Sequence, residues 1–125
     1  MQKKVLLDTN FIITCIENKI DFITQLKLEG FSIFVPDKVI KELETMKSSK
    51  RFKISKSKLA SIGLNILNKN AIIISLKGAY ADKAIINFAR EHPEFHVATL
   101  DKELRKKIKN KIGIRKSSKS INLDD

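Results

Sequence analysis

The chain alternates short continuous apolar runs with longer stretches in which apolar residues recur every three or four positions. The continuous runs predict strands at residues 4–7, 31–35, 71–76 and 95–100. The helical spacing predicts helices at residues 9–18, 19–30, from 36 onward, 57–68, 80–92 and 102–113. Strands separated by helices need crossover connections, which favour a mainly parallel sheet. The pattern therefore predicts an α/β fold, a three-layer α/β/α sandwich around a central sheet of four to five strands.

The last part of the chain decides how far this sheet extends. We expect the segment at residues 102–113 to form one basic helix that buries Leu104 and Ile108 and stops at Gly113. Either IGIR or SINL then forms a short edge strand. A chain of 125 residues buries one core, so we assign residues 1–123 to a single domain and 124–125 to a C-terminal tail. The inward residues of the helix at 57–68 are predicted to be Leu59, Ile62, Ile66 and Leu67.

Two of the predicted strands end in an aspartate. VLLD ends at Asp8 and VATLD ends at Asp101, and a carboxylate beside a buried strand loses solvation unless a helix cap, an ion pair or a metal compensates. The carboxyl ends of parallel strands share one edge of the sheet, where such folds bind ligands. Asp82 and Glu42 belong to helices that follow the third and second strands, so they reach the same edge. We therefore expect four carboxylates in one crevice.

Four ionised carboxylates in one crevice repel one another, and such a cluster takes up protons or binds a cation. Oxygen ligands without Cys or His suit Mg²⁺ or Mn²⁺, which activate water for phosphodiester hydrolysis. Glu44 lies about 200° around the helix from Glu42, so only one of them faces the crevice. The alternative for each aspartate is a helix N-cap or a first-turn acid.

The charge of the chain adds a polyanionic partner to this picture. Lys and Arg number 25 against 14 Asp and Glu, a formal charge of +11, which favours nucleic acid over a small neutral substrate. The runs KSSKRFKISKSK and KELRKKIKNKIGIRKSSK follow Glu42 and Asp101, so both flank the acidic edge. The alternative is a solvated lysine-rich surface. The residues predicted to bind phosphates are Lys50, Arg51, Lys53, Arg105, Lys106 and Lys109.

Other residue types narrow the chemistry further. Cys15 is the only cysteine, which excludes an internal disulfide and indicates a small core residue. The chain has no apolar run of membrane-spanning length and no pattern of a signal peptide near its start, so we expect a cytoplasmic protein. Most phenylalanines fall at core positions, which leaves only Phe52 as a weak candidate for stacking on bases.

Four segments in this order, LLDTN, VPDKVIKEL, ADKAIINFA and VATLDKELRKKIKNKIGI, resemble the PIN domain family of small metal-dependent ribonucleases. The resemblance covers nearly the whole chain and implies a PIN-like fold. It also implies that Thr9 and Asn10 orient Asp8 through hydrogen bonds, and that Thr99 does the same for Asp101. The acidic Mg²⁺ or Mn²⁺ site that it implies consists of Asp8, Glu42, Asp82 and Asp101.

The resemblance implies an endoribonuclease that leaves a 5′-phosphate on its product, and a protein that forms a homodimer. Two roles remain open: the toxin of a toxin–antitoxin pair, with an antitoxin as partner, and rRNA processing with a ribosome-assembly partner. A non-catalytic RNA-binding PIN-like protein of ribosome maturation is the main alternative. A phosphatase of the haloacid-dehalogenase type is disfavoured, because Asn10 stands where that family has a second aspartate.

Overall fold

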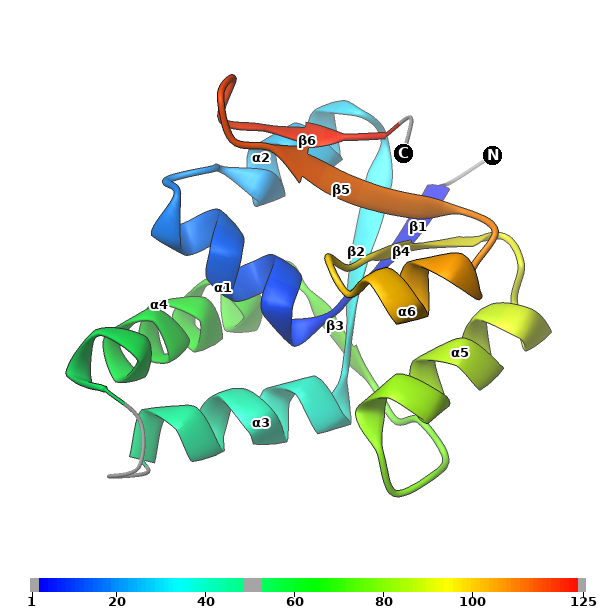
Figure 1. Ribbon diagram of the computed structural model, residues 1–125, viewed down its shortest axis with the longest axis horizontal. Coiled ribbons are helices and arrows are strands. Elements are labelled where there is room, and N and C mark those ends of the chain that lie inside the picture. Colours follow the sequence, from blue (N-terminus) through cyan, green and yellow to red (C-terminus); the bar gives the residue numbers. More distant parts are fainter. Residues whose placement is uncertain (1–2, 49–52, 124–125) are drawn as a thin grey trace.

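The computed structural model describes residues 3–48 and 53–123. The elements, labelled in Figure 1, are β1 (Lys3–Leu7), α1 (Thr9–Glu17), α2 (Phe22–Leu28), β2 (Phe31–Pro36), α3 (Asp37–Ser48), α4 (Ile54–Asn70), β3 (Ile72–Ile74), α5 (Ala81–Glu91), β4 (Phe95–Ala98), α6 (Lys102–Lys106), β5 (Lys111–Arg115) and β6 (Ser120–Asn122). The predicted alternation of strands and helices is therefore confirmed.

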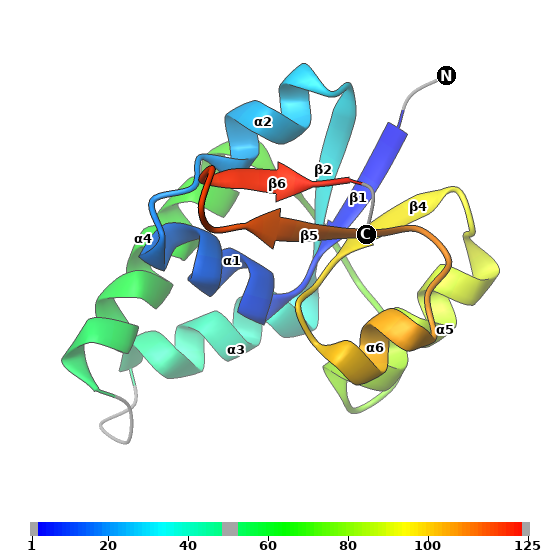
Figure 2. The ribbon, with the colours of Figure 1, turned by 45° about the horizontal axis from the view of Figure 1, so that its top comes forward.

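The strands form one sheet in the order β3-β2-β1-β4-β5-β6. β1 lies near its centre and pairs in parallel with β2 and β4, and the pairs β2–β3 and β4–β5 are parallel as well. β6 runs antiparallel to β5 (Figure 2). The prediction of a mainly parallel sheet is confirmed, but the sheet has six strands rather than four to five.

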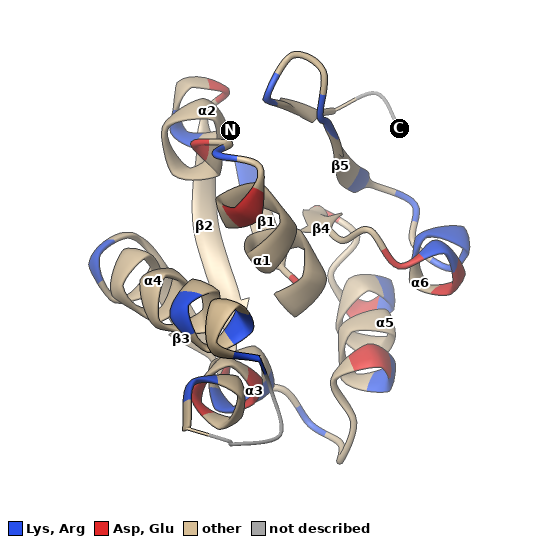
Figure 3. Ribbon diagram, turned by 60° about the vertical axis from the view of Figure 1, so that its left-hand side comes forward, with Lys and Arg blue, Asp and Glu red and all other residues tan. Residues whose placement is uncertain are grey.

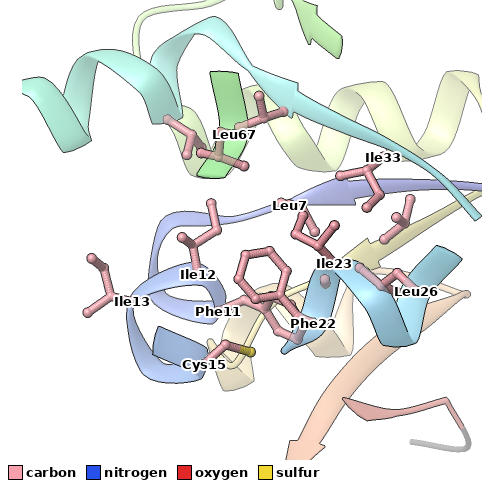
Figure 4. Packing of buried hydrophobic residues seen from close by; sticks show 14 of the residues in the cluster. Leu7, Phe11, Ile12, Ile13, Cys15, Phe22, Ile23, Leu26, Ile33 and Leu67 are labelled. Atoms are coloured by element: carbon pink, nitrogen blue, oxygen red, sulfur yellow. The ribbon is translucent and has the colours of Figure 1, made fainter. Parts of the chain in front are cut away.

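Side chains of β1 alternate between two hydrophobic clusters, one on each face of the sheet. Val5 and Leu7 pack with residues of α1, α2, α3 and α4, whereas Leu6 packs with residues of α5 and α6. Figure 4 shows part of the first cluster, where the rings of Phe11 and Phe22 meet edge to face at 5.9 Å between centroids. Helices therefore cover both faces of the sheet, which confirms the three-layer α/β/α sandwich.

The prediction of a single helix over residues 102–113 is wrong. α6 ends at Lys106, and β5 begins at Lys111. The carbonyl of Asn110 accepts a hydrogen bond from Val97 N–H (2.9 Å), so this segment bonds to β4 instead of to a preceding helical turn. Gly113 lies in β5 opposite Asn122, and IGIR and the first three residues of SINL both belong to strands. Tertiary pairing has overridden helical spacing here, although Leu104 and Ile108 are buried as predicted.

α4 begins at Ile54, earlier than predicted. Leu67 is buried, and Leu59 and Ile66 pack against the first cluster, as predicted. Ile62, predicted to face inward, is 45% exposed, whereas Gly63 is buried. A Cβ on Gly63 would lie 3.3 Å from Ile12 of α1, so the missing side chain is what lets the two helices pack closely. The remaining buried residues of α4 are Ala60 and Leu67.

The third strand is shorter and more exposed than predicted. β3 covers only Ile72–Ile74 at the edge of the sheet, and Ile72 and Ile73 are half-exposed. Cys15 is buried in the first cluster, as predicted for a core residue, and burial raises the pKa of its thiol to about 12. Within residues 3–48 and 53–123, no helix has the length and apolar character that crossing a membrane requires.

Candidate functional site

The candidate site lies where β1 and β4 end side by side. The connections from these neighbouring strands diverge at this point, which is where open α/β sheets form a crevice for ligands. The backbone N–H of Asp8 donates to the carbonyl of Ala98 (2.9 Å), which ties the two strand ends together. Asp8 is therefore held at the edge of the sheet that the sequence predicted.

The carboxylate of Asp8 is buried, with only 5% of the residue exposed. One oxygen accepts from the backbone N–H of Thr9 (2.9 Å), and the other accepts from the hydroxyl of Thr99 (2.8 Å). Burial raises the pKa of Asp8, these two hydrogen bonds lower it, and the nearby charges of Asp82 and Glu42 raise it further. Asp8 also caps α1, so the helix-cap interpretation and the site interpretation hold for the same residue.

Two hydroxyl groups link the acidic residues. The Thr9 hydroxyl donates to Oε1 of Glu42 (2.5 Å), which connects α1 to α3. The Thr99 hydroxyl, besides donating to Asp8, accepts from the backbone N–H of Asp101 (3.2 Å). Thr99 is fully buried, so this arrangement is protected from water. A single hydroxyl therefore fixes the relation between Asp8 and Asp101.

Asn10 was predicted to orient Asp8, but its side chain bonds to the segment that follows β4. Its Oδ1 accepts from the backbone N–H of Leu100 (3.0 Å) and lies 3.4 Å from the Thr99 hydroxyl. Asn10 therefore acts on Asp8 through Thr99, by positioning the residues that follow β4.

Three of the four predicted carboxylates line one cavity of about 410 Å³, which we call the first cavity. Asp8 lies at its base, with Glu42 from α3 and Asp82 from α5 around it, and Lys56 of α4 adds a positive charge. Glu44 is not part of this lining, which agrees with the choice of Glu42. The other lining residues are Thr9, Asn10, Ile13, Thr14, Glu17, Thr45 and Met46.

Asp101 lies outside the lining of the first cavity, although it is within the described part of the chain. Its carboxylate caps α6 by accepting from the backbone N–H groups of Glu103 (2.9 Å) and Leu104 (3.3 Å). The helix-cap alternative therefore describes the contacts that Asp101 makes here. Its connection to the other acids passes through Thr99.

The donor set of the first cavity fits a hydrated Mg²⁺ or Mn²⁺ ion. Among residues 3–48 and 53–123, no three His, Cys, Asp or Glu side chains are gathered closely enough to hold an ion by direct contact alone. Mg²⁺, however, keeps several waters and binds through one or two carboxylates. Asp8, Glu42 and Asp82 supply only oxygen donors around a space that accommodates such waters.

A second cavity of about 460 Å³ adjoins the first, because Glu42, Thr45 and Asp82 line both. Its other lining residues are Lys38, Lys41, Ala79, Tyr80 and Ala81. Acidic and basic residues are thus mixed on α3 and α5, with further basic residues on α4 (Figure 3).

The residues predicted to bind phosphates are dispersed around the molecule. Arg105 donates to the carbonyls of Thr99 (2.7 Å) and Ile112 (3.2 Å), and Lys106 pairs with Glu103 at 3.5 Å. Lys53 and Lys109 are exposed. Lys50 and Arg51 lie outside the described residues.

The sequence interpretation missed the residues that accompany the acids in the two cavities. Lys38 precedes Glu42 by four residues, which is one helical turn, so a helical projection of α3 would have placed them together. Asn10, Thr14 and Glu17 likewise share one face of α1. Lys56 was obscured because its segment was interpreted as a connection rather than as the start of α4.

Comparisons with known proteins agree with the predicted resemblance. A family model described as "PIN like domain" matches residues 5–116. "Ribonuclease VapC4" of Methanocaldococcus jannaschii is 36% identical over 109 residues, which cover 84% of this chain and 82% of that protein. "rRNA-processing protein fcf1" of Schizosaccharomyces pombe is 31% identical over 113 residues, which cover 88% of this chain and 55% of that protein. This chain therefore spans about half of the yeast protein.

A solved structure supports the same relationship at the level of the fold. The structure described as that of the "PIN domain endonuclease Utp24" matches with a TM-score of 0.78 and 26% sequence identity. The match covers 97% of this chain and 90% of that chain.

Proposed function

We propose that this chain, which belongs to the PIN domain family, is a metal-dependent endoribonuclease. The observation that carries the proposal is the convergence of Asp8, Glu42 and Asp82 on one cavity at the carboxyl edge of the sheet. The names of two relatives, a ribonuclease and a PIN domain endonuclease, support the same activity.

The residues that would hold Mg²⁺ or Mn²⁺ are Asp8, Glu42 and Asp82. Asp101 is the fourth proposed acid, and its backbone N–H bonds to the Thr99 hydroxyl that also contacts Asp8. A bound ion of this kind supplies an activated water and stabilises the charge that develops on a phosphodiester during hydrolysis. The buried Cys15 thiol, whose pKa is raised to about 12, is unsuited to act as a nucleophile.

The surrounding residues orient the acids and attract the substrate. Thr99 donates a hydrogen bond that favours the ionised form of Asp8, the form that binds cations, and Thr9 donates a hydrogen bond that positions Glu42. Lys56, across the first cavity, offers a charge to a phosphate that approaches the carboxylates. The exposed lysines at positions 53, 106 and 109, together with Lys50 and Arg51, remain predicted contacts for the rest of the RNA backbone.

The cellular role follows one of two directions. The similarity to a protein named for rRNA processing supports a role in ribosome maturation with a ribosome-assembly partner. The similarity to a ribonuclease of comparable length supports the toxin role, with an antitoxin as partner. In either role we propose RNA as the substrate and a homodimer as the assembled form.

The test follows cleavage of end-labelled structured and single-stranded RNAs with Mn²⁺, Mg²⁺ or EDTA. Wild type is compared with Asp82→Asn, which removes a charge from the first cavity. The control is Glu44→Gln, which removes an acid of α3, the helix of Glu42, that lies outside the cavity. We expect metal-dependent cleavage that Asp82→Asn abolishes and Glu44→Gln retains. RNA binding without cleavage under every metal condition would instead favour the non-catalytic RNA-binding role.

A further inference from the structure

We propose that Tyr80, together with Lys38 and Lys41, forms a subsite that binds one unpaired nucleotide of single-stranded RNA beside the carboxylates. The base stacks on the Tyr80 ring, and the phosphate lies towards the two lysines. This inference rests on the proposed function, because it concerns how the same site holds RNA. It assigns the second cavity to substrate recognition.

Tyr80 is a large aromatic side chain left in solvent next to the acidic residues. It is 73% exposed and lines the second cavity together with Glu42 and Asp82. Within residues 3–48 and 53–123, its ring contacts no other aromatic ring and its hydroxyl makes no hydrogen bond. The phenylalanine rings among the described residues pack in or against the core, as Phe11 and Phe22 do. Packing therefore does not account for the position of Tyr80.

The second cavity combines this ring with positive charge. Lys38 and Lys41 lie on α3 and line the cavity from the side opposite the start of α5, which Tyr80 precedes. Lysine binds phosphate as a compact point charge, whereas an exposed aromatic face accepts any base by stacking. The two kinds of group thus match the two parts of one nucleotide.

The backbone around Tyr80 is held in place on both sides. Before it, Asp37 at the start of α3 accepts from the backbone N–H of Leu76 (3.2 Å), which anchors the segment after β3 to α3. Gly78 adopts φ +109°, a conformation that favours glycine and turns the chain towards α5. After it, the Tyr80 carbonyl accepts from Ala84 N–H (3.0 Å) in the first turn of α5. The backbone that carries the ring is therefore anchored to α3 before Tyr80 and to the first turn of α5 after it.

This arrangement selects unpaired RNA. Bases inside a duplex are already stacked on their neighbours, so an aromatic side chain stacks only on a base that is splayed out of a helix. Tyr80 lies two residues before Asp82, so a base on its ring belongs to a nucleotide near the phosphodiester at the carboxylates. We therefore assign to Tyr80 the discrimination between an unpaired base and a base inside a duplex.

The chain carries its own reporter for this inference. Tyr80 is the only tyrosine and the chain has no tryptophan, so intrinsic protein fluorescence reports on this ring. Full-length protein in EDTA is titrated with a single-stranded oligoribonucleotide, with the same strand in a duplex, and with inorganic polyphosphate, which has charge but no bases. Free N-acetyltyrosinamide with the same additions corrects for light absorbed by the RNA.

We expect the single strand to quench Tyr80 fluorescence, and the duplex and polyphosphate to bind without quenching it. In binding measured with dye-labelled RNA, Tyr80→Ala should weaken single-strand affinity about five- to hundredfold, whereas Tyr80→Phe retains it within about twofold because the ring face remains. Replacing Lys38 and Lys41 by Gln should weaken binding of RNA and polyphosphate alike. Lys69→Gln, an exposed lysine of α4 outside both cavities, is the control and should change neither.

Unquenched fluorescence on saturation with single-stranded RNA would overturn the subsite, as would unchanged affinity of Tyr80→Ala. Equal quenching by the duplex would overturn the selection of unpaired RNA. All titrations contain EDTA and do not depend on cleavage, so they separate this inference from the nuclease activity. If wild type shows metal-dependent cleavage and Tyr80→Ala binds RNA normally, the subsite alone is rejected. If single-stranded RNA quenches the fluorescence of wild type but wild type does not cleave it with any metal ion, the nuclease alone is rejected.

Discussion

Replacement of Thr99 by valine removes one buried hydroxyl that contacts two of the proposed catalytic acids. In the wild-type protein this hydroxyl donates to Asp8 (2.8 Å) and accepts from the backbone N–H of Asp101 (3.2 Å). Valine has nearly the same volume, so the change leaves no cavity to confuse the result. The variant therefore isolates the hydrogen bonds.

The expected loss of stability follows from the burial of Asp8. A hydrogen bond to a charged group contributes about 1.5–3 kcal/mol, and the Thr99 bond is among the interactions that lower the raised pKa of Asp8. We therefore expect the free energy of unfolding at pH 7 to fall by about 1.5–3 kcal/mol. The loss should shrink towards acidic pH, because a protonated Asp8 no longer presents a charge to the missing donor.

Urea unfolding in EDTA, together with cleavage rates in Mn²⁺, measures both consequences. With a denaturant slope of about 1–3 kcal/mol/M, the urea midpoint should fall by roughly 1 M, and activity should fall about 10- to 100-fold because the supporting contact of the site is lost. The control is Thr24→Val, which removes a hydroxyl bonded to Asp21 (2.8 Å) on the exposed surface of α2. A midpoint for Thr99→Val no lower than that of the control would refute the reasoning.

Four further predictions concern charge. Burial raises the pKa of Asp8, so the free energy of unfolding of the wild-type protein in EDTA should fall as pH rises from 3.8 through the raised pKa. Asp8→Asn retains a good helix cap but has no such charge. Urea unfolding should therefore show that the variant lacks this loss and is more stable than wild type at pH 7. Mn²⁺ at 100 times its Kd should stabilise the wild-type protein by about 2.7 kcal/mol and so raise its melting temperature. In differential scanning fluorimetry, Mn²⁺ should leave the melting temperature of Asp82→Asn unchanged. Lys56→Gln should weaken single-stranded RNA binding and reduce the salt-dependence slope by about 0.7, as measured by titration at several salt concentrations. Arg105→Gln should lower the urea midpoint, because Arg105 donates to the carbonyls of Thr99 and Ile112; a loss of RNA affinity without a loss of stability would contradict this role.

The pattern of apolar residues predicted most of the fold because each buried element carries its own signal. Continuous runs such as Val5–Leu7 mark strands buried on both faces, and their order along the chain determines that they pair in parallel. The helix at 102–113 failed because its apolar spacing suits either structure, and pairing with β4 decides in favour of β5. The exposure of Ile62 was hidden for a similar reason, since spacing does not reveal that Gly63, next to it, is the position of α4 that lies against Ile12 of α1.

The acids of the candidate site were visible in the sequence because they follow strands, whose carboxyl ends must share an edge. The contacts that distinguish them were not visible. Whether Asp101 lines the first cavity or caps α6 depends on side-chain direction, which spacing does not encode. The proposed role of Tyr80 depends on the turn at Gly78, which brings Tyr80 to a cavity that residues of α3 also line. Such contacts between segments distant in sequence are not encoded in local spacing.

The most direct test of the central claim measures Mn²⁺ binding and RNA cleavage in the same samples. Free Mn²⁺ is followed by electron paramagnetic resonance in wild type, in Glu44→Gln as the control, and in the four single variants Asp8→Asn, Glu42→Gln, Asp82→Asn and Asp101→Asn. We predict that the variants of the three acids that line the first cavity lose Mn²⁺ affinity and cleavage together, while the control keeps both. Cleavage that persists in EDTA, or that persists in Asp8→Asn, Glu42→Gln and Asp82→Asn alike, would contradict a metal-dependent ribonuclease that uses these carboxylates.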